Sequence, residues 1–218
     1  MRQAHSADPS VDSVTGARGA LYGLLARLFE EPGHELHEAL ATGDVGDRLA
    51  AWVQTAGLEE VSVPTLETDD DHDLLCARFN DIFAVGYPDP PVPLYESSYA
   101  PEGEWESINL DLARAYDYFG AAIDEDRRDH HDHLVLQLEF AGYLARLAAV
   151  EDRPDLERAR RDFLDRHLVG FAEELESAIR AEVETGIYDE LVAFLAAFVR
   201  ADHRSLAAES DASEVTSP

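Results

Sequence analysis

Apolar residues recur at helical spacing along most of the chain, and polar residues fill the positions between them. No segment shows a convincing alternation with period two, which would indicate a β-strand, and no internal repeat is visible. The pattern predicts helices over residues 14–29, 36–40, 45–53, 73–85, 104–120, 129–150, 155–168, 171–183 and 187–199. We therefore expect a single all-α domain over residues 14–204, built as a bundle of about seven to nine helices.

The two ends of the chain lack this pattern. Residues 1–13 and 205–218 are polar, and the second segment is also acidic, so we expect both to be disordered. The longest apolar stretches are broken by Arg, Glu or Gly, which argues against a transmembrane helix, and the first residues lack the apolar core of a secretory signal. The single cysteine, Cys76, excludes an internal disulfide. These features predict a soluble cytoplasmic protein.

Composition adds a strong acidic bias. The 218 residues include 46 Asp or Glu against 17 Lys or Arg, all of them Arg, and the formal net charge is -29. This balance argues against binding to nucleic acid or to an anionic membrane surface, because both need a basic face. The acids form either a docking face for a cationic partner or an adaptation to a high-salt cytoplasm, where charges are screened within about 3 Å at about 1 M salt. Their spread over the whole chain favours the halophilic interpretation.

The sequence motifs of common catalytic sites are absent. The chain has no lysine for a phosphate-binding loop, no glycine-rich dinucleotide motif after a strand, and no G-x-S-x-G. His72 stands four residues before Cys76, and histidines cluster near residue 131, but zinc needs about four ligands that converge from more than one segment. We therefore predict no metal, no cofactor and no enzymatic activity. The alternative is a helical metal-dependent hydrolase that uses His72, His130, His131 or His133.

Residues 86–103, GYPDPPVPLYESSYAPEG, form the least regular part of the chain. Five prolines in this segment exclude a helix and favour an extended, partly polyproline loop. Tyr95 and Tyr99 offer rigid contact area, and Glu96 adds a fixed negative charge, so the loop has the parts of a peptide-binding groove. A structural crossover that packs its own tyrosines into the core explains the same composition equally well.

Two short blocks give the chain a resemblance to a known family. The first is PLYESSY at residues 93–99, and the second is HDHL at residues 131–134, followed by LEF at residues 138–140. Their order and spacing resemble the signature of the TorD/DmsD/NarJ family of redox-enzyme maturation chaperones, and the similarity extends over residues 14–204. One departure is His131, which stands where many members have proline.

This resemblance implies an all-α cytoplasmic chaperone rather than an enzyme. Such a protein binds the twin-arginine leader, the immature catalytic subunit, or both, of a molybdopterin oxidoreductase of the dimethyl sulfoxide reductase type. It assists cofactor insertion and delays export. The resemblance leaves open whether the protein is a monomer or a domain-swapped dimer, and whether a nucleotide binds. A generic helical interaction protein is the second alternative.

A leader peptide combines guanidinium groups with an apolar segment, so its acceptor needs carboxylates and an apolar groove. The two blocks supply seven candidates for peptide binding: Tyr95, Glu96, Ser97, Tyr99, Asp132, His133 and Glu139. The three carboxylates would bind the guanidinium groups, the tyrosines would line the groove, and the imidazole would orient the cluster. Asp132 equally suits the N-cap of the following helix, Glu139 equally suits a solvated position, and Ser97 suits an internal hydrogen bond. We expect the two blocks to lie side by side at a single cavity.

Overall fold

The computed structural model describes residues 13–123, 131–151, 153–183 and 186–215. Within these ranges the only β-structure is one isolated bridge, and no helix is both long and apolar enough to cross a lipid bilayer. The α-helices are α1 (Val14–Leu28), α2 (His34–Ala41), α3 (Asp44–Thr55), α4 (His72–Phe79), α5 (Trp105–Tyr118), α6 (Leu134–Val150), α7 (Pro154–Phe163), α8 (Val169–Glu182) and α9 (Ile187–Val215). The predicted all-α single domain is confirmed.

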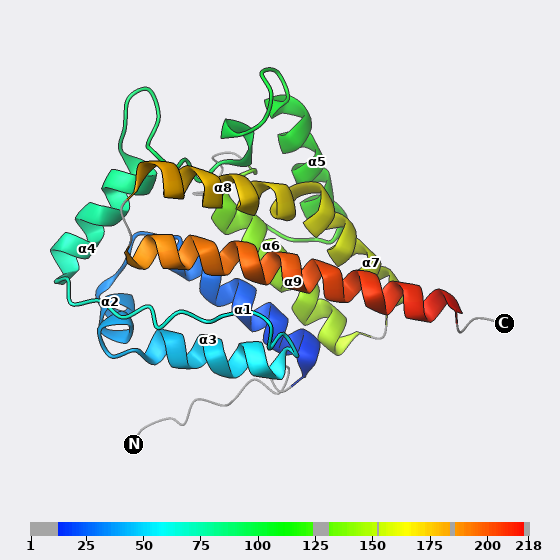
Figure 1. Cartoon of the computed structure of the whole chain (residues 1–218). Helices are drawn as coiled ribbons and strands as arrows, with labels where there is room; N and C mark the ends of the chain where they lie inside the picture. The colour runs from blue at the N-terminus through cyan, green and yellow to red at the C-terminus, as the bar shows by residue number, and fades with distance from the viewer. Residues whose placement is uncertain (1–12, 124–130, 152, 184–185, 216–218) are drawn as a thin grey trace.

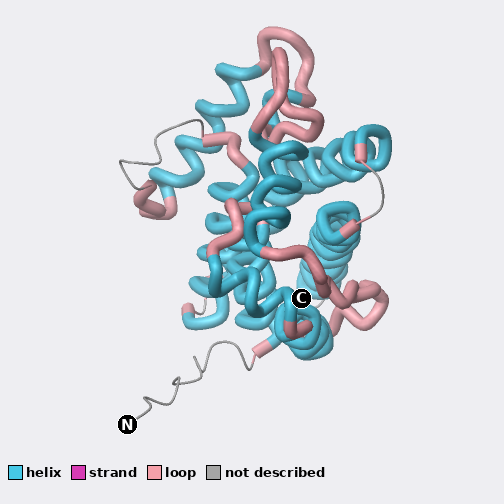
Figure 2. Tube along the Cα trace, turned by 90° about the vertical axis from the view of Figure 1, so that its left-hand side faces the viewer, coloured by secondary structure: helices cyan, strands magenta, loops and turns pink. Residues whose placement is uncertain are grey.

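Three shorter helical segments connect these elements. η1 (Asn80–Ala84) and η4 (Leu164–Leu168) are π-helical; the first continues α4, and the second joins α7 to α8. η2 (Glu96–Ser98) is a single 3₁₀ turn within the long connection from η1 to α5, which we call the α4–α5 loop (residues 85–104). This loop lies at the top of the molecule in Figures 1 and 2.

The most extensive helix pair is α1 against α6. A Cβ placed on Gly142 of α6 would lie 3.1 Å from the carbonyl oxygen of Gly19 on α1, so glycine at this crossing lets the two backbones approach closely. α8 and α9 form the other main pair and run side by side in Figure 1. The largest fully buried side chains come from α1, its C-cap and α9: Tyr22, Phe29, Phe194 and Phe198. The first and last helices therefore share one core.

The last helix is longer than predicted. α9 ends at Val215, whereas the apolar pattern placed its end at residue 199 and disorder over residues 205–218. The buried face continues past residue 199, because Asp202 and Leu206 are both buried. The helix therefore extends into the segment for which disorder was predicted, where Ser205 and Glu209 contact Arg18 of α1 and Leu206 is buried.

The N-terminal boundary also shifts by one residue. Ser13 was assigned to a disordered segment, but it is the N-cap of α1, and its hydroxyl oxygen accepts the backbone N–H of Gly16 at 3.0 Å. The remainder of that segment, residues 1–12, lies outside the described residues, as do residues 216–218.

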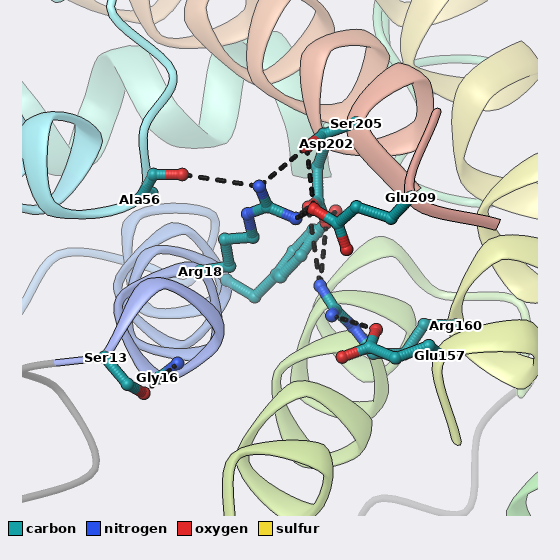
Figure 3. A network of polar contacts seen from close by, with 10 residues as sticks. Ser13, Gly16, Arg18, Ala56, Glu157, Arg160, Asp202, Ser205 and Glu209 are labelled. Atoms are coloured by element: carbon teal, nitrogen blue, oxygen red, sulfur yellow. Dashed lines mark hydrogen bonds and ion pairs between the residues drawn. The ribbon is translucent and has the colours of Figure 1, made fainter. Parts of the chain in front are cut away.

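A cluster of charged side chains is buried where α1, α7 and α9 meet (Figure 3). Asp202 of α9 is 0% exposed; its carboxylate lies 3.3 Å from Arg18 and 3.2 Å from Arg160, and it accepts the hydroxyl of Tyr22 at 2.9 Å. Arg18 also donates to the hydroxyl of Ser205 at 2.8 Å. Burial, followed by the charge of Asp202, raises the pKa of Tyr22, so its phenol stays a protonated donor. One carboxylate thus joins three helices.

The acidic composition predicts a protein that loosens in dilute buffer. Salt at about 1 M limits repulsion between exposed carboxylates to about 3 Å, against about 10 Å at 0.1 M. We expect the melting temperature to fall by about 5–10 °C between multimolar and dilute KCl, since each kcal/mol lost shifts it by about 2–4 °C for a chain of this size. Circular dichroism melts measure this difference. Equal melting temperatures in the two buffers would contradict the halophilic interpretation.

Candidate functional site

Tyr95 of the α4–α5 loop and His133 before α6 lie side by side, as the sequence predicted. The two residues form an antiparallel bridge, and their rings meet edge to face with centroids 4.9 Å apart. Two backbone hydrogen bonds flank the bridge, from Leu134 N–H to the Leu94 oxygen at 2.8 Å and from Glu96 N–H to the Asp132 oxygen at 3.1 Å. The two blocks of the family signature therefore form one local structure.

Asp132 is fully buried behind the loop. Its Oδ2 accepts the backbone N–H of Ser97 at 3.1 Å, and its backbone oxygen accepts Nε2 of the buried Gln137 at 3.2 Å. Two further buried acceptors, Asp132 Oδ1 and Gln137 Oε1, have no hydrogen-bond donor among the described residues. The carboxylate of Asp132 anchors η2, and a peptide could reach it only if the loop moved.

α6 begins later than the apolar pattern predicted. Its N-cap is His133, whose Nδ1 accepts the backbone N–H two residues further on at 3.2 Å. The helix starts at Leu134 rather than at residue 129, because His133 has an extended conformation and pairs with the loop. The hypothesis that Asp132 caps this helix is therefore wrong.

The side chain of Glu96 contacts α6 and η4. Gln137 Nε2 donates to its Oε2 at 2.8 Å, and His167 Nδ1 lies 3.1 Å from the same oxygen. The second ring nitrogen of His167 lies 3.1 Å from Asp111 Oδ2 on α5. One ring, 7% exposed, thus ties the loop to α5 and η4.

His167 is a site residue that the candidates from the sequence did not include. It follows Asp165 and Arg166 in η4, 71 residues from Glu96, and no spacing rule connects positions so far apart. The π-helical turn of η4 also changes which residues face the core, so a period of about 3.6 residues does not place this side chain. The available signal was the family resemblance, which extends over the segment from Phe163 through His167.

Tyr99 stabilises the conformation of the α4–α5 loop through a hydrogen bond within the loop. Its hydroxyl donates to the backbone oxygen of Pro93 at 3.0 Å, and its ring packs on Phe171 with centroids 5.8 Å apart. Burial, and then the charge of Glu174, raises the pKa of Tyr99, so the phenol stays a neutral donor. Tyr99 therefore packs against the protein as expected of a tyrosine in a structural crossover loop. Tyr95 instead faces the start of α6.

A largely apolar groove with a volume of about 560 Å³ adjoins Tyr95 and His133; we call it the loop groove. Its aromatic wall is continuous, because the ring of Phe83 lies 5.3 Å from that of Phe79 and 6.0 Å from that of Phe29. The lining residues are Phe29, Glu30, Glu31, Phe79, Phe83, Ala84, Pro90, Leu94, Tyr95, His133, Val135 and Leu136. Apolar walls with a few charged groups are typical of sites that bind peptide side chains.

The other candidates do not share the loop groove. Glu96 and Tyr99 line a second cavity of about 630 Å³ between α5 and α8, which we call the α5–α8 cavity. Glu139 is exposed on α6 and lines a third cavity of about 490 Å³. The prediction of a single cavity is wrong, because the loop separates Tyr95 and His133 from Glu96 and Tyr99.

The histidines considered for metal binding do not converge in the described ranges. No group of three or more His, Cys, Asp or Glu is arranged there to hold a metal ion. His72 does contact Cys76, with Nε2 3.6 Å from the sulfur, but the same nitrogen lies 2.9 Å from the backbone oxygen of Pro32. His130 lies outside the described residues.

The sequence profile of a family described as "Nitrate reductase delta subunit" matches residues 27–177, more than half of the chain. The matched segment contains the α4–α5 loop, the bridge to His133, and His167. All the residues that line the loop groove therefore fall within it.

Three curated relatives are named as assembly chaperones. The chain is 39% identical over 115 residues to the selenate reductase assembly chaperone protein of Thauera selenatis (50% of this chain, 60% of the relative). It is 33% identical over 114 residues to the chlorate reductase assembly chaperone protein of Ideonella dechloratans (50% and 59%). It is 29% identical over 196 residues to the perchlorate reductase assembly chaperone protein of Dechloromonas aromatica (85% and 88%). The chain thus spans less than two thirds of the length of the first two relatives.

A crystal structure of a candidate redox enzyme maturation protein from Archaeoglobus fulgidus aligns with 95% of this chain and 97% of its own, at 20% identity and a TM-score of 0.47. The family assignment depends instead on the profile, which covers both signature blocks. The chain therefore belongs to the nitrate reductase delta subunit family, which is the TorD/NarJ family that its motifs resemble.

Proposed function

We propose that this protein is a cytoplasmic assembly chaperone for the catalytic subunit of a molybdopterin oxidoreductase of the dimethyl sulfoxide reductase type. It binds the immature subunit, including its twin-arginine leader, and acts by binding rather than by catalysis. Membership of the family and the similarity to three relatives named as assembly chaperones support this role. The structural observation that carries the proposal is the loop groove, where the two signature blocks meet.

The loop groove has the chemistry that a leader peptide needs. Phe79 and Phe83 form an apolar wall for the hydrophobic part of the leader. Tyr95 offers an aromatic face on which a guanidinium can stack, and Glu30 and Glu31 offer carboxylates for its N–H groups. High salt screens exposed ion pairs, so apolar contacts contribute most of the affinity under halophilic conditions.

The mechanism is preferential binding to the immature chain. A leader or an unfolded segment exposes apolar side chains that become buried when the subunit folds around its cofactor. A partner that binds only the exposed form stabilises that form, by about 2.7 kcal/mol at a concentration of 100 times Kd. Occupancy falls when cofactor insertion and folding bury the recognised segment. Release then permits export, which binding had delayed.

Replacing Tyr95 by alanine is expected to weaken binding of a synthetic twin-arginine leader about tenfold or more, which is about 1.4 kcal/mol. The substitution removes an aromatic wall of the loop groove and its edge-to-face contact with His133. Fluorescence anisotropy titration of a labelled leader peptide, in buffer with high KCl, measures the change.

Tyr87→Ala is the matched control, because Tyr87 belongs to the same loop, is 99% exposed, and does not line the loop groove. We expect its affinity for the leader to equal that of the wild type. A folded Tyr95→Ala variant with wild-type affinity would remove Tyr95 from the site. Absence of binding by the wild type would count against leader recognition itself.

A further inference from the structure

The segment that carries Tyr95 into the wall of the loop groove is held from two directions. On one side its backbone pairs with the start of α6, through the antiparallel bridge to His133. On the other side the side chain of Glu96 lines the α5–α8 cavity, where it contacts Gln137 of α6 and His167 of η4. The orientation of Tyr95 therefore depends on contacts that lie behind the loop.

His167 attaches the loop to an element other than α6. Its Nδ1 lies 3.2 Å from Oε1 and 3.1 Å from Oε2 of Glu96, so one ring nitrogen meets both carboxylate oxygens. The two side chains are 7% and 13% exposed, so water competes little for this contact. Gln137 approaches the same carboxylate from α6, the helix at whose start the loop backbone is already bound. His167 thus provides a separate point of attachment, on η4.

The imidazole of His167 is itself held in place. Its Nε2 lies 3.1 Å from Asp111 Oδ2 on α5, and the same oxygen lies 2.5 Å from Arg166 Nη2. The ring also packs against Phe163, with centroids 5.5 Å apart. A ring with a contact at each nitrogen and a phenyl ring beside it has little freedom to follow Glu96, so it is a fixed point for the loop.

His167 is separate from the surface that a leader peptide would meet. It lines the α5–α8 cavity, whereas the lining of the loop groove includes Tyr95 but not His167. A peptide in the loop groove therefore contacts Tyr95 directly. An effect of His167 on its affinity must pass through the α4–α5 loop.

We propose that His167 is a positioning residue for the loop groove, which fixes the side chain of Tyr95 by holding the neighbouring Glu96. This role deepens the proposed function and rests on it. The peptide bond between Tyr95 and Glu96 is planar, so a displacement of one residue is transmitted to the other. A binding surface that already has its bound conformation loses less conformational entropy on binding. Without His167, the leader would have to order the loop as it binds.

Two substitutions at His167 test the contact with Glu96. His167→Leu removes both ring nitrogens, and we expect it to bind the labelled leader about five- to tenfold more weakly than the wild type. His167→Asn places an amide nitrogen close to the position of Nδ1, where it can donate to Glu96, so we expect an affinity within about twofold of the wild type. Anisotropy titration in high KCl measures both affinities, and circular dichroism checks that both variants fold.

His203→Leu is the matched control, because His203 of α9 also contacts η4, but at Asp165, with 3.3 Å between the nearest atoms. We expect it to bind the leader as tightly as the wild type. Wild-type affinity of a folded His167→Leu variant would overturn the proposal. Equal losses in His167→Leu and His167→Asn would overturn it as well, because a residue needed only for packing does not distinguish the two.

Combination with Tyr95→Ala tests the path of the effect. If His167 acts through Tyr95, the double variant Tyr95→Ala, His167→Leu binds the leader no more weakly than Tyr95→Ala alone. Losses that multiply would show that the two residues act independently, against the proposal. Should His167→Leu fail to fold, Glu96→Ala takes its place, because it removes the same contact from the more exposed partner. Wild-type affinity of that variant would be an equally clear refutation.

Hydrogen exchange measures the positioning of the loop without any leader. We expect the backbone amides of residues 95–99 to exchange about tenfold faster in His167→Leu than in the wild type or His167→Asn, because the loop opens more often. Unchanged exchange would overturn the positioning role. Faster exchange, together with no binding of the leader by the wild type, would overturn leader recognition and support the positioning of the loop by His167.

Discussion

Replacing Asp202 by alanine is expected to lower the free energy of unfolding by about 3–5 kcal/mol, because it leaves buried cations without their central carboxylate. Arg18 and Arg160 are both buried, and both lie within 3.3 Å of Asp202. Burial alone would lower the pKa of Arg160, but the charges of Asp202 and Glu157 reverse that effect and raise it. The hydroxyl of Tyr22 would lose its acceptor as well.

Denaturant unfolding followed by circular dichroism, at constant KCl, measures this loss. Asp162→Ala is the matched control, because Asp162 is 69% exposed and its pair with Arg166 is 3.6 Å long. We expect that control to change stability by no more than about 0.5 kcal/mol. If both variants unfold at the same denaturant concentration, Asp202 does not hold the three helices together.

Replacing Asp132 by alanine is expected to cost about 1–3 kcal/mol of stability and to weaken leader binding at the same time. The backbone N–H of Ser97 would lose its acceptor, and η2 would lose its anchor. Tyr95 immediately precedes η2, so the wall of the loop groove would become less well defined. Thermal melts and the leader titration measure the two effects in the same samples.

Asp132→Asn separates this positioning role from direct contact with a peptide. Asparagine keeps a side-chain oxygen that can accept the N–H of Ser97, so we expect much smaller losses of stability and affinity than with alanine. A folded Asn variant that loses as much affinity as the Ala variant would show instead that the charge of Asp132 meets the peptide, which its complete burial argues against.

Helical periodicity was sufficient to predict most elements but not the end of α9. The spacing of three or four residues continues along this helix at four buried positions: Leu195, Val199, Asp202 and Leu206. In the sequence alone, the aspartate in this series indicates the end of the apolar stripe, because the side chains that bind its carboxylate are not known. Its partners, Arg18 and Arg160, occupy buried positions on other helices, and no local pattern identifies them.

The family signature correctly predicted that the two blocks are in contact. The further prediction that they line a single cavity was wrong. Tyr95 has an extended backbone, with φ −120° and ψ 127°. Successive side chains of an extended segment point to opposite sides, so Tyr95 and Glu96 reach different cavities although they are adjacent in the motif. Because this alternation depends on the conformation of the loop, it could not be inferred from the proline content alone.

The position of Asp202 in the chain has a consequence for the order in which the protein is made. Asp202 follows its partner Tyr22 by 180 residues, so the ribosome produces Arg18 and Arg160 well before the acid that neutralises them. A nascent chain therefore cannot bury these arginines favourably until α9 has left the exit tunnel. The cluster that joins α1, α7 and α9 therefore forms only once α9 is in place.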